Sequence, residues 1–117
     1  ALPILVMSAG WSCYEWLLGS RKDAEFDHDK LSRMLETVGS SISQQPDNTR
    51  QAMNRFVIAT GVSFKPLHEE ASRTAERIGE VTVVRKGKTI ALQNAFESIA
   101  REAEKGRVGF KRRHVRC

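Results

Sequence analysis

The stretch RQAMNRFVIATGVSFKPL, residues 50–67, decides how this chain folds. Drawn as a helix at about 100° per residue, it gathers its few polar or small residues within about 60° of arc. These residues, called the polar seam below, are Arg50, Asn54, Gly61 and Lys65. The rest of the circumference is largely apolar, which predicts a helix covered by neighbouring helices on both sides. The polar seam is then either one wall of a groove or a set of buried groups with internal partners.

Four further segments carry apolar residues at helical spacing. They span about residues 5–18, residues 28–42 after an N-cap at Asp27, residues 66–78 and residues 94–105. In the last segment the spacing predicts an inward face made of Ala95, Phe96, Ile99 and Ala103. The tryptophans of the first segment, Trp11 and Trp16, are expected to pack between helices. Short helices in antiparallel order predict a mainly α fold of the α-α superhelix class, as in HEAT and armadillo repeats.

Residues 80–92 do not follow the helical spacing of apolar residues. Two runs rich in β-branched residues flank the tripeptide at 86–88, which predicts a small β-hairpin turning at Lys86 and Gly87. Its basic residues, Arg85, Lys86 and Lys88, either extend a cationic surface or are only solvated.

Positive charge is concentrated at the C-terminal end of the chain. The 117 residues include 19 lysines and arginines against 14 acidic residues, a net charge of +5. Six of those cations and none of the acids lie in residues 105–117. We therefore divide the chain into a helical-repeat part of a larger superhelix, residues 1–104, and a basic tail, residues 105–117. A cationic segment beside a helical body is typical of binding to DNA phosphates, and the alternative is a solvated tail.

The composition argues against several kinds of site. Cys13 and Cys117 have no CxxC spacing and no histidine at ligand distance, so we expect reduced thiols with no disulfide, no metal and no cofactor. Residues 2–7 lack both the basic flank of a signal peptide and the length of a membrane span, which favours a cytoplasmic protein without a membrane partner. Since the chain opens without methionine, we interpret it as a piece of a longer protein, whose cut N-terminal face is available for self-association.

Three blocks of residues occur in a familiar order. They are AGW at residues 9–11, MN-x-FVIA-x-G-x-x-x-KPL at residues 53–67 with Pro46 and Arg50 before it, and GRVG-x-KR at residues 106–112 with the terminal Cys117. Together they resemble the C-terminal part of the DNA alkylation-repair (AlkD-like) family of HEAT-like repeat proteins. The resemblance runs through nearly the whole chain and implies an α-α superhelix, a DNA partner and a process of DNA repair.

The same resemblance does not imply catalysis by this piece. Family members that excise alkylated purines hold DNA in a concave basic groove and use tryptophans with a carboxylate, and those groups would lie upstream of this chain. The arginine that the family pattern places before AGW is replaced by Met7 or Ser8. An acidic turn followed by a cysteine, expected near residues 80–92, is replaced by basic residues. We therefore expect a non-catalytic fragment, with catalytic residues unknown.

The leading hypothesis is a helical-repeat module related to DNA alkylation repair that binds the backbone of double-stranded DNA and reads shape in place of base sequence. The DNA-binding residues are then Arg50, Asn54 and Lys65 in the groove and Arg107, Lys111, Arg112, Arg113 and Arg116 in the tail. The alternative is a helical scaffold for protein–protein interaction or self-association. A fully buried and paired Arg50 favours this alternative, whereas an Arg50 open to solvent beside the tail favours DNA. A third hypothesis is an enzyme whose catalytic half lies outside this chain.

Overall fold

The computed structural model describes the backbone of residues 4–111 and the side chains of residues 10–111. In this range the α-helices are α1 (Ile4–Leu18), α2 (His28–Ser41), α3 (Asp47–Ser63), α4 (His68–Ile78) and α5 (Ala95–Glu104). Short 3-10 turns occupy Asp23–Glu25, Ile42–Gln44 and Lys65–Leu67, and an antiparallel hairpin is formed by β1 (Thr82–Arg85) and β2 (Lys88–Ala91). The predicted mainly α class and the small hairpin are confirmed.

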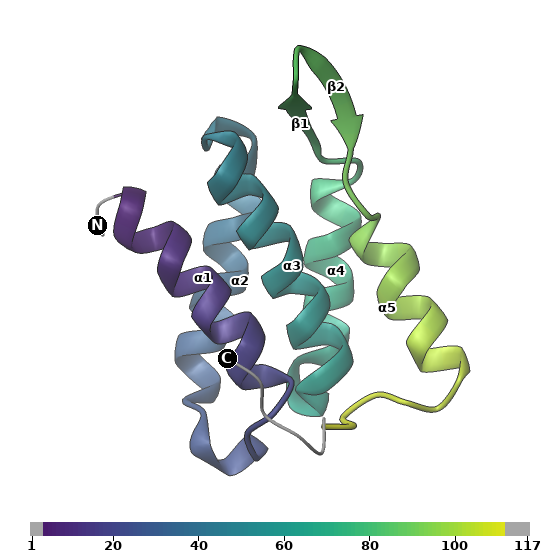
Figure 1. Ribbon diagram of the computed structural model, residues 1–117. Helices are drawn as coiled ribbons and strands as arrows, with labels where there is room; N and C mark the ends of the chain where they lie inside the picture. The colour runs from purple at the N-terminus through teal and green to yellow at the C-terminus, as the bar shows by residue number, and fades with distance from the viewer. Residues whose placement is uncertain (1–3, 112–117) are drawn as a thin grey trace.

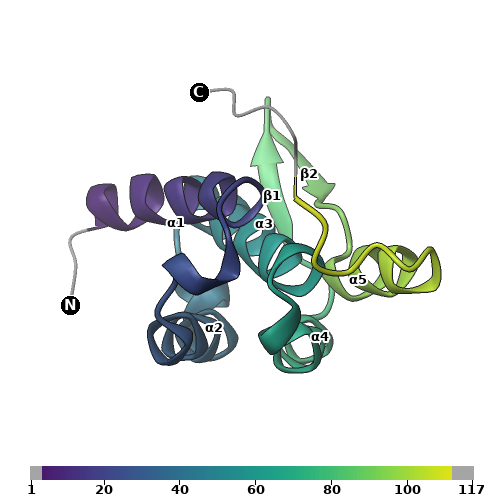
Figure 2. The same ribbon diagram turned by 90° about the horizontal axis from the view of Figure 1, so that it is seen from below.

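Helix α3 lies at the centre of the molecule. Helices α1 and α5 pack on its two sides, and α2 and α4 form a second layer that covers one face of this row (Figures 1 and 2). Successive helices run in opposite directions, so the odd-numbered helices are parallel to one another (Figure 1). Two layers of alternating antiparallel helices are the arrangement of HEAT-like repeats.

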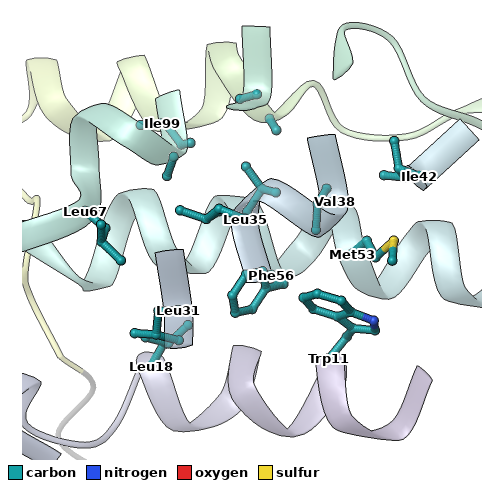
Figure 3. Close-up of a cluster of buried hydrophobic side chains, with 14 of the residues drawn as sticks. Trp11, Leu18, Leu31, Leu35, Val38, Ile42, Met53, Phe56, Leu67 and Ile99 are labelled. Carbon is teal, nitrogen blue, oxygen red and sulfur yellow. The ribbon is translucent and has the colours of Figure 1, made fainter. Parts of the chain in front are cut away.

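The hydrophobic core fills the space between the two layers. Met53, Phe56 and Val57 of α3 have no exposed surface. Trp11 of α1 lies edge-on against Phe56, with ring centroids 5.0 Å apart, as Figure 3 shows. Edge-to-face packing of two buried rings stabilises a core, so the predicted packing role of Trp11 is confirmed.

Local sequence signals determine several chain reversals. The side chain of Asp27 accepts a hydrogen bond from the backbone N–H of Lys30 at 3.1 Å, as expected of the N-cap of α2. Lys86 and Gly87 have φ angles of 52° and 76°. Positive φ at both central residues is the geometry of the two-residue turns that suit hairpins, so the predicted turn position is confirmed.

The predicted inward face of α5 is only half right. Ala95 and Ile99 are buried, but Ala103 is exposed and Phe96 keeps 40% of its surface accessible. Helix α5 stands at the end of its layer, where the helices packed on it within the described chain are α3 and α4. The apolar residues of α5 spread over a wider arc of the helix than these two neighbours cover, so part of the predicted inward face stays exposed.

Residues 105–111, the first part of the predicted tail, fold back onto the helices. The backbone N–H of Gly109 donates to the carbonyl oxygen of Val62 at 2.7 Å. The Nζ of Lys111 donates to the carbonyls of Leu18 and Ser63, the last residues of α1 and α3. Helix-terminal carbonyls without an intrahelical partner attract cationic donors, which explains why this segment is not separate from the body. Arg112, Arg113 and Arg116 lie outside the described residues.

No helix in residues 4–111 combines the length and the apolar character that crossing a membrane requires.

Candidate nucleic-acid interface

Two residues of the polar seam, Asn54 and Gly61, face α5. Asn54 is 2% exposed, and its Nδ2 donates to the carbonyl oxygen of Gln93 at 2.9 Å, just before α5. Gly61 lies under Ile99, so closely that a Cβ at this position would stand 2.5 Å from the Cδ1 of that isoleucine. Asn54 and Gly61 thus serve the contact between two helices, and Asn54 is not accessible to a ligand.

Arg50 belongs to a cluster that fastens the hairpin to the first turns of α3. It forms an ion pair with Asp47, and 24% of its side chain is exposed. The other carboxylate oxygen of Asp47 accepts a hydrogen bond from the backbone N–H of Val84 at 2.9 Å. One turn away, the guanidinium of Arg85 donates to the side-chain oxygen of Gln51. These residues, called the hairpin anchor below, give Arg50 a structural partner.

The hairpin anchor should weaken in acid. The hydrogen bond from the Val84 N–H, with the Arg50 guanidinium, lowers the pKa of Asp47 below its ordinary value of 3.8. A carboxyl group with a lowered pKa in the folded state stabilises that state fully above its ordinary pKa, and the stabilisation is lost as pH falls from 3.8 through the lowered value. Hydrogen exchange of the hairpin amides should therefore show protection, corrected for intrinsic rates, that falls as the pH drops below the ordinary pKa of 3.8.

Asp47→Asn should remove this dependence on pH, because the amide side chain does not titrate in that range. Asp29→Asn is the matched control, since 85% of the Asp29 side chain is exposed and Asp29 lies on α2. Equal pH dependence in the wild type and in Asp47→Asn would contradict the role of the carboxylate.

Lys65 and Arg107 lie near the opposite end of α3 from Arg50. Lys65 is exposed, and its side chain borders Gly109, where a Cβ would stand 3.5 Å from the Cβ of Lys65. Arg107 is exposed in the same segment. Arg50 is roughly 20 Å away along the helix axis. The structure therefore places Lys65 beside Gly109, in the segment that carries Arg107, and leaves Arg50 and Asn54 apart from it.

The ammonium group of Lys111 already has three acceptors. Its Nζ lies 2.9 Å from the carbonyl oxygen of Leu18, 2.6 Å from that of Ser63 and 2.8 Å from the Oδ1 of Asp23. Two of the three N–H donors of the ammonium are thus hydrogen-bonded to carbonyl oxygens, and the carboxylate of Asp23 neutralises its charge. The cation caps the C-terminal ends of α1 and α3, so the structure gives Lys111 an internal role, and its contact with DNA stays a prediction from sequence.

A groove of about 670 Å³ lies along α3, between α1, α5 and residues 105–111. It is called the α3 groove below. The half-buried side chains of Ile58, Ala59 and Val62 contribute its apolar part. Its charged lining residues are Arg55, Arg101, Lys105, Arg107 and Lys111, with Glu15 and Glu102.

The cations of the α3 groove are only partly neutralised. Lys105 forms an ion pair with Glu102 at 3.7 Å. By contrast, Arg55, Arg101 and Arg107 are exposed and form no ion pair with any residue in the described range. Three unpaired guanidinium groups around one groove make a site suited to a polyanion, since the planar fork of arginine matches phosphate oxygens.

Sequence reasoning missed Arg55 and Arg101. Arg55 follows Asn54 in sequence but lies on a neighbouring face of α3, with Ile58 and Val62 three and seven residues further on. Residues spaced i, i+3 and i+7 lie on one face of a helix. A single arginine on this otherwise apolar face was the sequence feature that could have identified Arg55 as a candidate. Arg101 carried no comparable signal, because only the packing of α5 beside α3 brings it to the groove.

Comparison with known proteins places this architecture among HEAT-like repeat proteins. No model of a known protein family matches the sequence. Uncharacterised proteins of Listeria monocytogenes and Listeria innocua are 29% and 31% identical to it over 79 residues, which are 68% of this chain and 32% of each relative.

One solved structure superimposes with a TM-score of 0.88 at 50% sequence identity, covering 98% of this chain. The match covers 49% of that protein, so the present chain spans about half of its length and about a third of the Listeria proteins. That protein represents a new family related to the HEAT-like repeat DNA glycosylases, with affinity for branched DNA structures. The chain described here is thus similar, over nearly all of its length, to a protein of that family.

Proposed function

We propose that this chain is part of a DNA-binding helical-repeat protein, that the α3 groove holds the DNA backbone, and that branched DNA is the preferred ligand. The observation that carries the proposal is the set of exposed arginines, Arg55, Arg101 and Arg107, around a groove with an apolar part; none of the three forms an ion pair with another described residue. The affinity of the solved relative for branched DNA supports the choice of ligand.

The charges of the groove suit a branch point better than a plain duplex. Arg55 belongs to α3, Arg101 to α5 and Arg107 to the segment after α5, so the cations approach the groove from separate elements. At a branch point several phosphate backbones converge, and a concave site with cations on more than one side can contact two of them at once. Contacts of this kind give affinity without reading bases.

Further cations extend the proposed surface. Lys65, beside Gly109, and the exposed hairpin residues Lys86 and Lys88 are available for phosphates. Arg112, Arg113 and Arg116 remain proposed phosphate contacts on the grounds of sequence alone. The specific relationship to alkylation repair, and a cytoplasmic location, are further parts of the proposal that rest on the three sequence blocks and on composition.

Removing a phosphate-contacting arginine should weaken binding to all DNA sequences alike. For Arg55→Ala, Arg101→Ala and Arg107→Ala we expect a slope of log affinity against log salt that is smaller by about one unit per substitution. Fluorescence anisotropy with a labelled four-way junction and with a duplex of matched sequence, titrated at several salt concentrations, measures both affinity and slope.

Arg33→Ala is the matched control, because Arg33 is exposed on α2, in the layer that does not line the groove. An unchanged slope in all three groove variants would place binding elsewhere on the chain. If the wild type binds neither ligand at low salt, the proposal is wrong for this chain. The scaffold hypothesis would then take its place; Arg50 is paired with Asp47, although 24% of its side chain is exposed.

A further inference from the structure

Phe110 is a large aromatic residue that the fold leaves in solvent. Its surface is 68% exposed, more than that of any other large hydrophobic residue in the described range. It lines the α3 groove together with Arg107 and Lys105, at the end where residues 105–111 cross the helices. An exposed phenylalanine therefore stands among the cations proposed to hold DNA.

The backbone around Phe110 is held on both sides. The N–H of Phe110 donates to the carbonyl oxygen of Arg107 at 3.2 Å, which closes a four-residue turn. Gly109 has a φ of +89°, as the third residue of a type II turn requires, and its N–H donates to Val62 at 2.7 Å. The next residue, Lys111, is bound to the ends of α1 and α3. The aromatic ring is thus presented from an anchored turn.

An anchored, exposed ring within a basic groove is suited to stacking on a nucleobase. Proteins that bind unpaired nucleic acid combine cations along the backbone with aromatic side chains on which bases stack. Within a continuous duplex each base is already stacked on its neighbours, so the ring finds a free base face only where stacking is interrupted. Branch points and strand ends offer such faces.

We infer that Phe110 stacks on an unpaired or terminal base at the branch point of DNA bound in the α3 groove, and so contributes the preference for branched over continuous DNA. This inference rests on the proposed function, and it adds the recognition element that the arginines do not provide. Phosphate contacts are available on every DNA, whereas a free base face is specific to interrupted helices.

A second exposed phenylalanine in the described range, Phe96, has a different environment. Phe96, 40% exposed, lies in a shallow hollow on α4 and α5 whose charged lining residues are Glu69, Arg73 and Glu104. Two carboxylates beside one guanidinium do not attract a polyanion. Phe96 therefore serves as a matched control, being an exposed phenylalanine outside the α3 groove.

The test compares Phe110→Ala, Phe110→Leu, Phe110→Trp and Phe96→Ala in the full chain. The ligands are a three-way junction with two unpaired bases at the branch and a continuous duplex of the same length. Phe110→Ala should weaken junction binding by about 5- to 150-fold, the range measured for loss of a stacked base, and leave duplex binding unchanged. Phe110→Trp should retain junction affinity, Phe110→Leu should lose most of it, and Phe96→Ala should resemble the wild type.

A second readout reports on stacking itself. With 2-aminopurine as the unpaired base, the wild type and Phe110→Trp should quench its fluorescence on binding, and Phe110→Ala should not. Wild-type junction affinity and quenching in Phe110→Ala would overturn the inference and leave the proposed function intact. An equal loss on junction and duplex would also overturn it. If the wild type binds neither DNA, the proposed function itself fails. Thermal unfolding of each variant verifies that the exposed site tolerates substitution.

Discussion

Gly61→Val should destabilise the fold by roughly 3 kcal/mol, at the upper end of the usual cost of overpacking a core. The reason is the close contact between α3 and α5, where a Cβ at position 61 would stand 2.5 Å from the Cδ1 and 2.7 Å from the Cγ1 of Ile99. Ile99 is itself fully buried and has little space to yield. Chemical denaturation followed by circular dichroism measures the change in the free energy of unfolding.

Two further variants separate this contact from general effects of replacing glycine. Gly10→Ala should be neutral or stabilising by up to about 1 kcal/mol, since no atom lies within 4 Å of a Cβ there and alanine favours a helix. Combining Gly61→Val with Ile99→Ala should destabilise the fold by less than the sum of the single changes. The shorter alanine side chain leaves room for the valine, and the valine fills part of the cavity that Ile99→Ala creates. Additive costs in this double variant would show that the two residues do not compete for the same space.

Lys111→Met should cost roughly 2 kcal/mol of folding stability, because hydrogen bonds to a charged group contribute about 1.5–3 kcal/mol and this side chain keeps some contact with water. The substitution preserves the apolar stem but leaves the terminal carbonyls of α1 and α3, and the carboxylate of Asp23, without their cation. We also expect faster hydrogen exchange in residues 105–111, since Lys111 fastens that segment to the body.

The same substitution distinguishes a structural cation from a phosphate contact. Lys105→Met is the control in the same segment, because the exposed pair of Lys105 with Glu102 contributes at most about 1 kcal/mol. At a temperature where the variant remains folded, Lys111→Met should keep the salt slope of DNA binding. A slope smaller by about one unit with unchanged stability would instead support the role that the sequence suggested.

Much of the fold could be predicted from local signals. The N-cap at Asp27 and the two-residue turn at Lys86 and Gly87 depend on residues a few positions apart, and the structure confirms both. Helical spacing of apolar residues likewise predicted each of the helices in the described range. Such signals depend on residues within one or two helical turns of one another, so they can be recognised without knowledge of the tertiary packing.

The candidate site was predicted less well, because a helix has several faces and spacing does not say which neighbour covers each one. For Asn54 and Gly61 the sequence left open a groove wall or buried groups with internal partners, and both residues meet α5. Arg55, on another flank of the same helix, lines the groove. Lys111 and Phe110 are adjacent in sequence, yet one binds helix ends and the other is open to solvent.

The sequence by itself determined the mainly α class, the positions of helices and hairpin, and the excess of positive charge near the C-terminal end. The tertiary structure alone decided which cations are neutralised internally, as at Arg50 and Lys111, and which form no ion pair within residues 10–111, as at Arg55, Arg101 and Arg107. The physical reason is that burial and ion pairing are properties of residues far apart in the chain. Ser63 and Lys111, 48 positions apart, meet only when α3 and the segment after α5 have packed together.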